Sequence, residues 1–412
     1  MRTLSPRLIL CLLMAFWWML FGVKINIVDL GGSGVRLDDV IFALSVPLLI
    51  MAIPPTSLPR PFVTFCLFVL TSLLSLLLGA IAVRISLIEG ILYWFRNLQY
   101  VSFFLLGLLL AQRFSLERML RAYTLYLVIF IALQYFNLLP SFSAFVGSSR
   151  AIANTGGPYE LAAIAALLGF FFWHQARNRF YFVCAIVILV MTQSRITLAA
   201  FVLVMFALGV KTRGRIVGLS VGLAAALVFS FVDLAVLDRF AGLFDEKTLQ
   251  TFVKLLGDIP SFPDTWGYRD WAFSTFMDAL PTDGDTSAII RFTRQFSLIQ
   301  STLNCGTECV LFGLGPSFAV SAVDGNLVRL FVEYGVIGTL LFLVGTWQVA
   351  KRTGNRTVIS YYVLLVITAF AIDILVSSKA MSLFWFLCGY YWQRRLVASA
   401  QNAADAPLPV PA

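Results

Sequence analysis

Long apolar stretches recur along this chain, and they leave few folds open to it. They lie at residues 8–23, 36–53, 62–82, 90–111, 121–139, 159–173, 180–193, 196–210, 216–234, 327–349, 357–376 and 380–392. A helix needs about 20 such residues to cross a bilayer. Only 12% of the residues are charged, against about 25% in soluble domains. The pattern therefore predicts an all-α integral membrane protein with about 12 transmembrane helices.

The basic residues indicate how these helices are oriented. They gather in alternate connections, at Arg60, at Arg113, Arg118 and Arg121, at Arg177 and Arg179, at Lys211, Arg213 and Arg215, at Lys351, Arg352 and Arg356, and at Arg394 and Arg395. Lysine and arginine are concentrated in cytoplasmic connections. Both termini are therefore expected in the cytoplasm of a bacterial inner membrane. The net charge of +9 is explained by this topology and does not indicate nucleic-acid binding.

The same pattern divides the chain into four parts. Residues 1–234 are expected to hold nine transmembrane helices, and residues 327–393 three more. Residues 235–326 are too polar to cross a membrane and are predicted to form one large periplasmic loop. Residues 394–412 are rich in alanine and proline and are expected to be a disordered cytoplasmic tail.

The periplasmic loop has internal structure of its own. Residues 244–257 and 286–303 show the spacing of amphipathic helices. Cys305 and Cys309 follow the second of these helices, in a compartment that is oxidising. The spacing predicts a local disulfide, with two free thiols as the alternative.

Arginines on the outer side are not explained by topology. The loop carries more acids than bases, so Arg291 and Arg294 are candidate ligands for an anion. Ser194 and Arg195 open the eighth apolar stretch, where a helix N-terminus offers free N–H groups and the guanidinium adds a bidentate donor. These residues predict a phosphate site at the outer membrane face. The alternative is a plain helix cap with an arginine that reaches toward the surface.

Two further charged residues flank the outer end of the sixth apolar stretch. Arg150 precedes the sequence Gly156-Gly157-Pro, and Glu160 follows it. Glycine permits a close backbone approach and proline suits a first helical turn. The segment is consistent with an entrance to a site, and equally with a loop that simply ends at a helix.

Charged side chains inside apolar helices are candidates for function because lipid does not solvate them. Asn326, Arg329 and Glu333 make one polar stripe at the start of the tenth stretch, so this stripe is expected to face the other helices. Arg96 lies within the fourth stretch with Glu89 two turns earlier on the same face. This spacing predicts either a structural ion pair or a functional charge.

Together these motifs resemble a known family. Thr-Gln-Ser-Arg at 192–195 is followed by an outer loop with arginine-containing helices, by Gly-Leu-Gly-Pro at 313–316, and by Asn-x-x-Arg-x-x-x-Glu-Tyr-Gly-x-Ile-Gly at 326–338. The combination is similar to the O-antigen polymerase (Wzy) and O-antigen ligase (WaaL) superfamily. The resemblance runs from about Arg36 to Gly338.

The resemblance implies a metal-independent membrane glycosyltransferase of GT-C type that uses no cofactor. Such an enzyme takes a glycan from undecaprenyl diphosphate on the periplasmic side and transfers it to a sugar hydroxyl. The family's diphosphate-binding arginines match Arg150, Arg195, Arg291 and Arg294 here, and Ser194 stands beside one of them. Implied partners are the lipid-linked donor and acceptor glycans, the bilayer and a chain-length regulator protein.

The choice within the family depends on the segment before the tenth stretch. Ligases carry a His-Asn pair there, whereas this chain has Asp324-Gly-Asn326, so polymerisation of O-antigen or related surface polysaccharide is preferred over ligation to lipid A-core. Asp324 is the first candidate for the proton acceptor and Glu160 the second. A flippase or another transporter of lipid-linked oligosaccharide is the alternative from a different class.

Aromatic residues in the outer loop could contribute to sugar binding. Trp266, Tyr268 and Trp271 lie close together in the sequence of this loop. Aromatic rings of this kind either stack on sugar rings or pack within the fold. Both roles are open at this stage.

Overall fold

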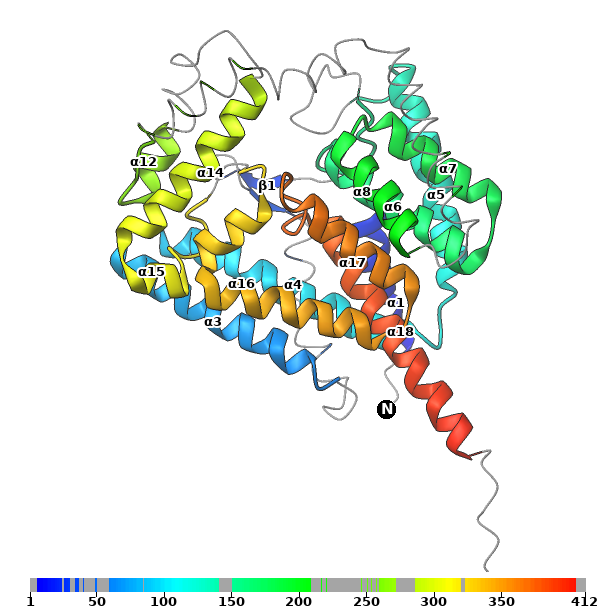
Figure 1. Cartoon of the computed structure of the whole chain (residues 1–412). Helices are drawn as coiled ribbons and strands as arrows, with labels where there is room; N and C mark the ends of the chain where they lie inside the picture. The colour runs from blue at the N-terminus through cyan, green and yellow to red at the C-terminus, as the bar shows by residue number, and fades with distance from the viewer. Residues whose placement is uncertain are drawn as a thin grey trace, which may run out of the picture.

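A computed structural model describes most of the chain, and the described part is almost entirely helical (Figure 1). The described residues are 6–23, 26–29, 34–36, 59–83, 85–140, 150–208, 259–271, 286–319 and 323–404, with single positions at 40, 49, 216, 220, 246, 250, 253 and 257. The helices are α1 (Pro6–Phe21), α3 (Phe62–Ala82), α4 (Leu87–Leu110), α5 (Leu116–Tyr135), α6 (Pro158–Phe171), α7 (Arg179–Met191), α8 (Arg195–Leu208), α12 (Thr265–Asp270), α14 (Thr286–Cys305), α15 (Thr307–Phe312), α16 (Asn326–Arg352), α17 (Arg356–Thr368) and α18 (Ser378–Ala404). A π-helical turn, η2 (Phe172–Ala176), and an antiparallel hairpin of β1 (Asn26–Asp29) and β2 (Gly34–Arg36) complete the described elements.

The expected all-helical architecture is confirmed. A helix lies in each apolar stretch that falls in the described residues, although the stretch at 357–376 is helical only as far as Thr368. The stretches 36–53 and 216–234 lie almost wholly outside the described residues. Two of the described helices, α3 and α16, are long and apolar enough to cross a membrane. Shorter apolar helices occur at Leu10–Phe21, Arg179–Met191, Arg195–Leu208 and Arg356–Thr368.

The segment 235–326 matches its predicted local structure where it is described. The helix expected at 286–303 is α14, and a disulfide joins Cys305 at its end to Cys309 in α15. The helix expected at 244–257 lies outside the described residues except for single positions.

Two features differ from expectation at the ends of the chain. The last helix, α18, continues to Ala404, so the first part of the expected disordered tail is helical. Alanine and long straight side chains favour this extension, because they lose little conformational freedom in a helix. The hairpin of β1 and β2 was not foreseen, because its strands are too short to show an alternating pattern.

Close backbone contacts hold the helices together. Figure 1 shows two groups of helices, α3, α4, α12, α14, α15 and α16 in one and α5–α8 in the other, with α17 and α18 between them. Gly107 of α4 faces the carbonyl of Phe386 in α18, and Gly389 of α18 faces the carbonyl of Phe104 in α4. A Cβ at either glycine would collide with that carbonyl oxygen. Small residues of this kind let helices associate without a hydrophobic driving force.

A break in α16 shapes the region around the polar stripe. Gly335 has φ 66°, a left-handed conformation that interrupts the helix. Residues 313–315 pack alongside the break, because the Leu314 N–H donates to the carbonyl of Val332 at 2.7 Å and the Gly315 N–H donates to that of Glu333 at 3.1 Å. The Gly-Leu-Gly motif therefore has a structural role.

A separate apolar core attaches α12 and α14 to α16. Tyr268 of α12, Leu298 of α14 and Val332 of α16 are buried together, and Leu314 and Phe318 lie between them. This core fixes α14 relative to the start of α16. Its effect is to hold α14 where Arg291 can contact Asp324, two residues before α16 begins.

We predict that Gly389→Ala will destabilise the protein by about 1–3 kcal/mol, as overpacking does elsewhere. The added methyl group would displace the Phe104 carbonyl and separate α4 from α18. Thermal unfolding of the detergent-purified protein measures the effect. Gly257→Ala is the control, because a Cβ there meets nothing within 4 Å. Equal melting temperatures for the two variants would contradict the proposed close packing.

Candidate functional site

Tyr159, the second residue of α6, lies between two of the predicted arginines. The guanidinium of Arg150 lies over its ring, 4.7 Å from the centroid. Its hydroxyl accepts a hydrogen bond from Nη2 of Arg291 in α14 at 3.3 Å. Sequence reasoning did not identify Tyr159, although its position directly after Pro158 made it part of the predicted entrance. This ring joins two arginines that are far apart in the sequence.

Arg291 also contacts the predicted proton acceptor. Its Nε donates to Oδ2 of Asp324 at 3.1 Å, and the two side chains are 30% and 26% exposed. Burial lowers the pKa of Arg291, but the neighbouring Asp324 carboxylate outweighs that effect, so this pKa lies above its ordinary value. Arg291 is therefore a permanent cation beside a carboxylate at the start of α16.

The start of α8 adjoins this cluster through Arg150. Nε of Arg150 donates to the carbonyl of Thr192 at 3.0 Å, three residues before Arg195 opens the helix. Ser194 is buried, and its hydroxyl shares a 2.8 Å hydrogen bond with that of Thr197. Arg195 and Arg294 are both partly buried, the first at the helix N-terminus and the second one turn after Arg291.

The polar stripe on α16 faces inward as predicted. Asn326, Arg329 and Glu333 are all buried. Nε of Arg329 donates to Oε1 of Glu333 at 3.2 Å, and Nη1 lies 3.7 Å from Oδ2 of Asp373. One buried guanidinium is thus shared by two carboxylates.

Asp373 connects this buried network to Asp324. Its carboxylate accepts the N–H of Val323 at 2.8 Å and the N–H of Gly325 at 3.2 Å, the residues on either side of Asp324. Asp324 itself has φ 56°, and its carbonyl accepts a hydrogen bond from Gln295 at 2.9 Å. The Asp373 carboxylate therefore fixes the backbone that presents Asp324 to Arg291.

Sequence reasoning missed Asp373. The residue lies within the apolar stretch predicted at 357–376, and an acid at such a position is a functional candidate by the same rule that selected Arg96. The structure puts it in the connection between α17 and α18. Asn326 also reaches this connection, because its Oδ1 accepts the N–H of Leu375.

The ion pair expected between Glu89 and Arg96 does not form. Glu89 instead accepts a 2.7 Å hydrogen bond from Nη2 of Arg269, which α12 brings to the N-terminal turn of α4. Arg96 lies over the ring of Tyr93, 4.6 Å from its centroid, and Arg329 lies 5.7 Å from the same centroid. Arg96 is therefore close to the buried network around Arg329.

Glu160 is engaged in a structural network. Its Oε2 accepts the N–H of Gly156 at 2.7 Å, and its Oε1 accepts the Ser377 hydroxyl at 2.6 Å and the Lys379 N–H at 2.8 Å. The Lys379 ammonium donates to the carbonyls of Leu20, Gly22 and Asn154. The Glu160 carboxylate thus joins α6 to the start of α18.

The aromatic residues of the outer loop divide between the two roles considered for them. Tyr268 is buried against Phe318, and Trp271 packs on Phe262. Trp266 is 56% exposed, and the guanidinium of Arg269 lies 4.7 Å from its ring centroid. Only Trp266 of these three therefore presents a largely accessible ring.

Comparison with known proteins adds no assignment. No protein-family model matches the chain, and no curated protein sequence is similar to it. The functional argument therefore depends on the cluster of Arg150, Tyr159, Arg291 and Asp324 and on the buried network behind it.

We predict that Asp373→Asn will destabilise the protein by about 3 kcal/mol, as expected when an ion pair that is only 6% and 14% exposed loses one partner. An asparagine cannot accept both backbone N–H groups equally well. The substitution also removes one of the two negative charges that face Arg329. Thermal unfolding in detergent measures the loss. Glu117→Gln breaks the exposed pair with Arg121 and should change stability by less than about 1 kcal/mol. Similar losses in both variants would contradict the role given to Asp373.

Proposed function

We propose that this chain is a multi-pass protein of the bacterial inner membrane, with about 12 spans and both termini in the cytoplasm. The arrangement of the basic connections supports this topology. Nη1 of Arg395 donates to the carbonyl of Arg352 at 2.7 Å, so the basic residues of α18 meet the basic end of α16. Both α6 and α16 begin beside the cluster of Arg150, Arg291 and Asp324 and end beside basic residues. The cluster and the basic connections therefore belong to opposite ends of the same helices.

Within that topology we propose a metal-independent glycosyltransferase that polymerises oligosaccharide repeat units linked to undecaprenyl diphosphate, on the periplasmic side. The observation that carries the proposal is the contact of Arg150 and Arg291 with one tyrosine, beside a carboxylate. The arginines suit a diphosphate, because guanidinium groups bind phosphate oxygens in a bidentate manner. The carboxylate suits a base that accepts a sugar proton.

The reaction follows from this placement. A hydroxyl of the acceptor glycan attacks the anomeric carbon of the donor glycan, and its proton passes to Asp324. The bond from that carbon to the diphosphate oxygen breaks, and undecaprenyl diphosphate leaves with the electron pair. Arg195 and Arg291 stabilise the charge that develops on the leaving oxygen, with Arg150 and Arg294 assisting.

The glycans would lie beneath α12 and α14. Trp266 offers an exposed ring on which a sugar can stack. Arg269 beside it is held by Glu89 of α4, so this ring is tied to the helix bundle. Trp266 is therefore the proposed sugar-binding residue of the outer loop.

We predict that Arg291→Ala will slow chain growth by about 10²–10³-fold, the effect of removing one donor that stabilises a developing oxyanion. Arg195→Ala should also abolish the ladder of longer glycans. The assay supplies purified protein with lipid-linked repeat units and resolves the products by length. Arg118→Ala, an exposed residue at the other end of the helices, is the control.

Other outcomes of this assay separate the alternatives. A full ladder from both arginine variants would contradict the mechanism. Transfer to lipid A-core without chain growth would identify a ligase. Movement of substrate across vesicle membranes without chain growth would identify a flippase.

Asp324→Asn and Glu160→Gln distinguish the two acid candidates. We expect Asp324→Asn to abolish chain growth with little change in melting temperature, because its side chain is partly exposed. We expect Glu160→Gln to lower the melting temperature and the yield of folded protein, because its carboxylate is buried and bonded to three donors. Activity and thermal unfolding are measured on the same preparations. The reverse result would make Glu160 the base.

A further inference from the structure

A second polar site lies at the opposite end of the helices from the proposed reaction. It is a pocket of about 450 Å³ between the connection of α4 to α5, the turn η2 and α18. This volume lies in the range of about 300–1,000 Å³ that is typical of small-molecule sites. None of the residues proposed for glycan transfer lines it.

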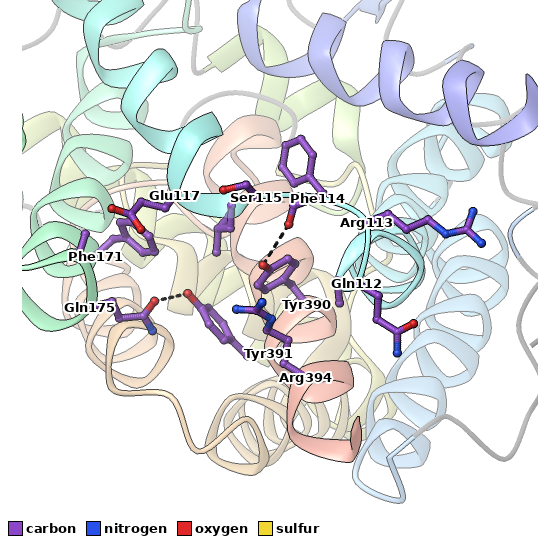
Figure 2. A pocket seen from close by; sticks show the side chains of 13 residues that line it. Gln112, Arg113, Phe114, Ser115, Glu117, Phe171, Gln175, Tyr390, Tyr391 and Arg394 are labelled. Carbon is purple, nitrogen blue, oxygen red and sulfur yellow. Dashed lines mark hydrogen bonds between the residues drawn. The ribbon is translucent and has the colours of Figure 1, made fainter. Parts of the chain in front are cut away.

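The pocket is walled by two tyrosines and rimmed by cations. Figure 2 shows the rings of Tyr390 and Tyr391 next to the guanidinium of Arg394, with Gln175 on one side. Arg113 lies on the other side, and its guanidinium extends away from Arg394. The Tyr390 hydroxyl donates to the carbonyl of Phe114 at 3.2 Å, and the Tyr391 hydroxyl donates to Oε1 of Gln175. These bonds hold the walls in place.

The charge balance of the lining favours an anion. Glu117 is the acid among the lining residues, and Arg121 pairs with it. Arg113 and Arg394 add two positive charges, and Arg394 lies 5.4 Å from the ring centroid of Tyr390. The N-terminus of α5 adds the positive end of its helix dipole. The Ser115 side chain makes no cap hydrogen bond there.

The proposed topology decides which anion can reach the pocket. The basic connections that line it belong to the cytoplasmic side, where anionic phospholipids gather around lysine and arginine. Basic pockets between transmembrane helices on this side bind lipid headgroups. A soluble phosphate compound would meet the same residues of the pocket. The phosphate group is therefore the feature that a lipid headgroup and a soluble anion would share.

We propose that this pocket binds the headgroup phosphate of an anionic phospholipid from the cytoplasmic leaflet. Arg394 and Arg113 bind the phosphate oxygens, and the tyrosine walls contact the glycerol. The inference rests on the proposed membrane topology and not on the glycosyltransferase activity.

The test uses two neighbouring arginine pairs as matched variants. Arg394 lines the pocket and Arg395 does not, and Arg113 lines it while Arg118 does not. Native mass spectrometry of the delipidated full-length protein, titrated with phosphatidylglycerol, gives the affinity of each variant. Arg394→Gln and Arg113→Gln should each weaken binding about fivefold, the contribution of one basic residue near an anionic surface. Arg395→Gln and Arg118→Gln should stay close to the parent protein.

Separate arms identify the source of the phosphate. Phosphatidylcholine should bind more weakly than phosphatidylglycerol, and inorganic phosphate at millimolar concentration should not displace the lipid. Equal losses for Arg394→Gln and Arg395→Gln would show only a diffuse basic surface and would overturn the proposal. Binding of inorganic phosphate with the affinity of the lipid would also overturn it. Neither result would affect the test of glycan transfer, because that site lies at the other end.

Discussion

The carboxylate of Asp373 is the contact on which the rest of the site depends. It accepts the N–H groups on both sides of Asp324 and also faces Arg329, so it is bound to the start of α16 from two directions. The Asp373 side chain is only 14% exposed, and a carboxylate so withdrawn from water is stable only where a cation and hydrogen-bond donors compensate its lost hydration. Arg329 supplies that charge and shares it with Glu333. The left-handed backbone of Asp324 is the local cost of this arrangement, and such strain persists where the surroundings impose it.

The second constraint is the contact of α12, α14 and residues 313–315 with α16. Residues 313–315 pack on the break at Gly335, and the buried core of Tyr268 and Leu298 adds apolar contact. Arg291 belongs to α14, which packs with α12 and α16, whereas Arg150 and Tyr159 belong to the group of helices that includes α6. The proposed site therefore joins two parts of the molecule, and Tyr159 is the side chain that both arginines touch.

The apolar helices could be predicted from the sequence because the length of an apolar stretch indicates where such a helix occurs. The inward face of Asn326, Arg329 and Glu333 was also predictable, since a polar stripe on an apolar helix must avoid lipid. Pairings between distant segments could not be predicted from the sequence. Glu89 and Arg96 share a helical face, yet the partner of Glu89 is Arg269, which comes from a helix far along the chain. Asp373 and Tyr159 act through the same kind of long-range contact, and no local pattern reveals which segments meet.

The orientation of Arg291 bears on how the proposed reaction is accelerated. Its Nε donates to Asp324 and its Nη2 donates to Tyr159, so the guanidinium plane is oriented before any substrate arrives. The other N–H groups of the guanidinium can then meet a phosphate without a search through side-chain rotamers. Stabilisation by donors that are already oriented requires no reorganisation as charge develops. A flexible arginine at the same position would carry equal charge but would lose rotamer entropy on binding, so the two contacts explain why this arginine is suited to a leaving diphosphate.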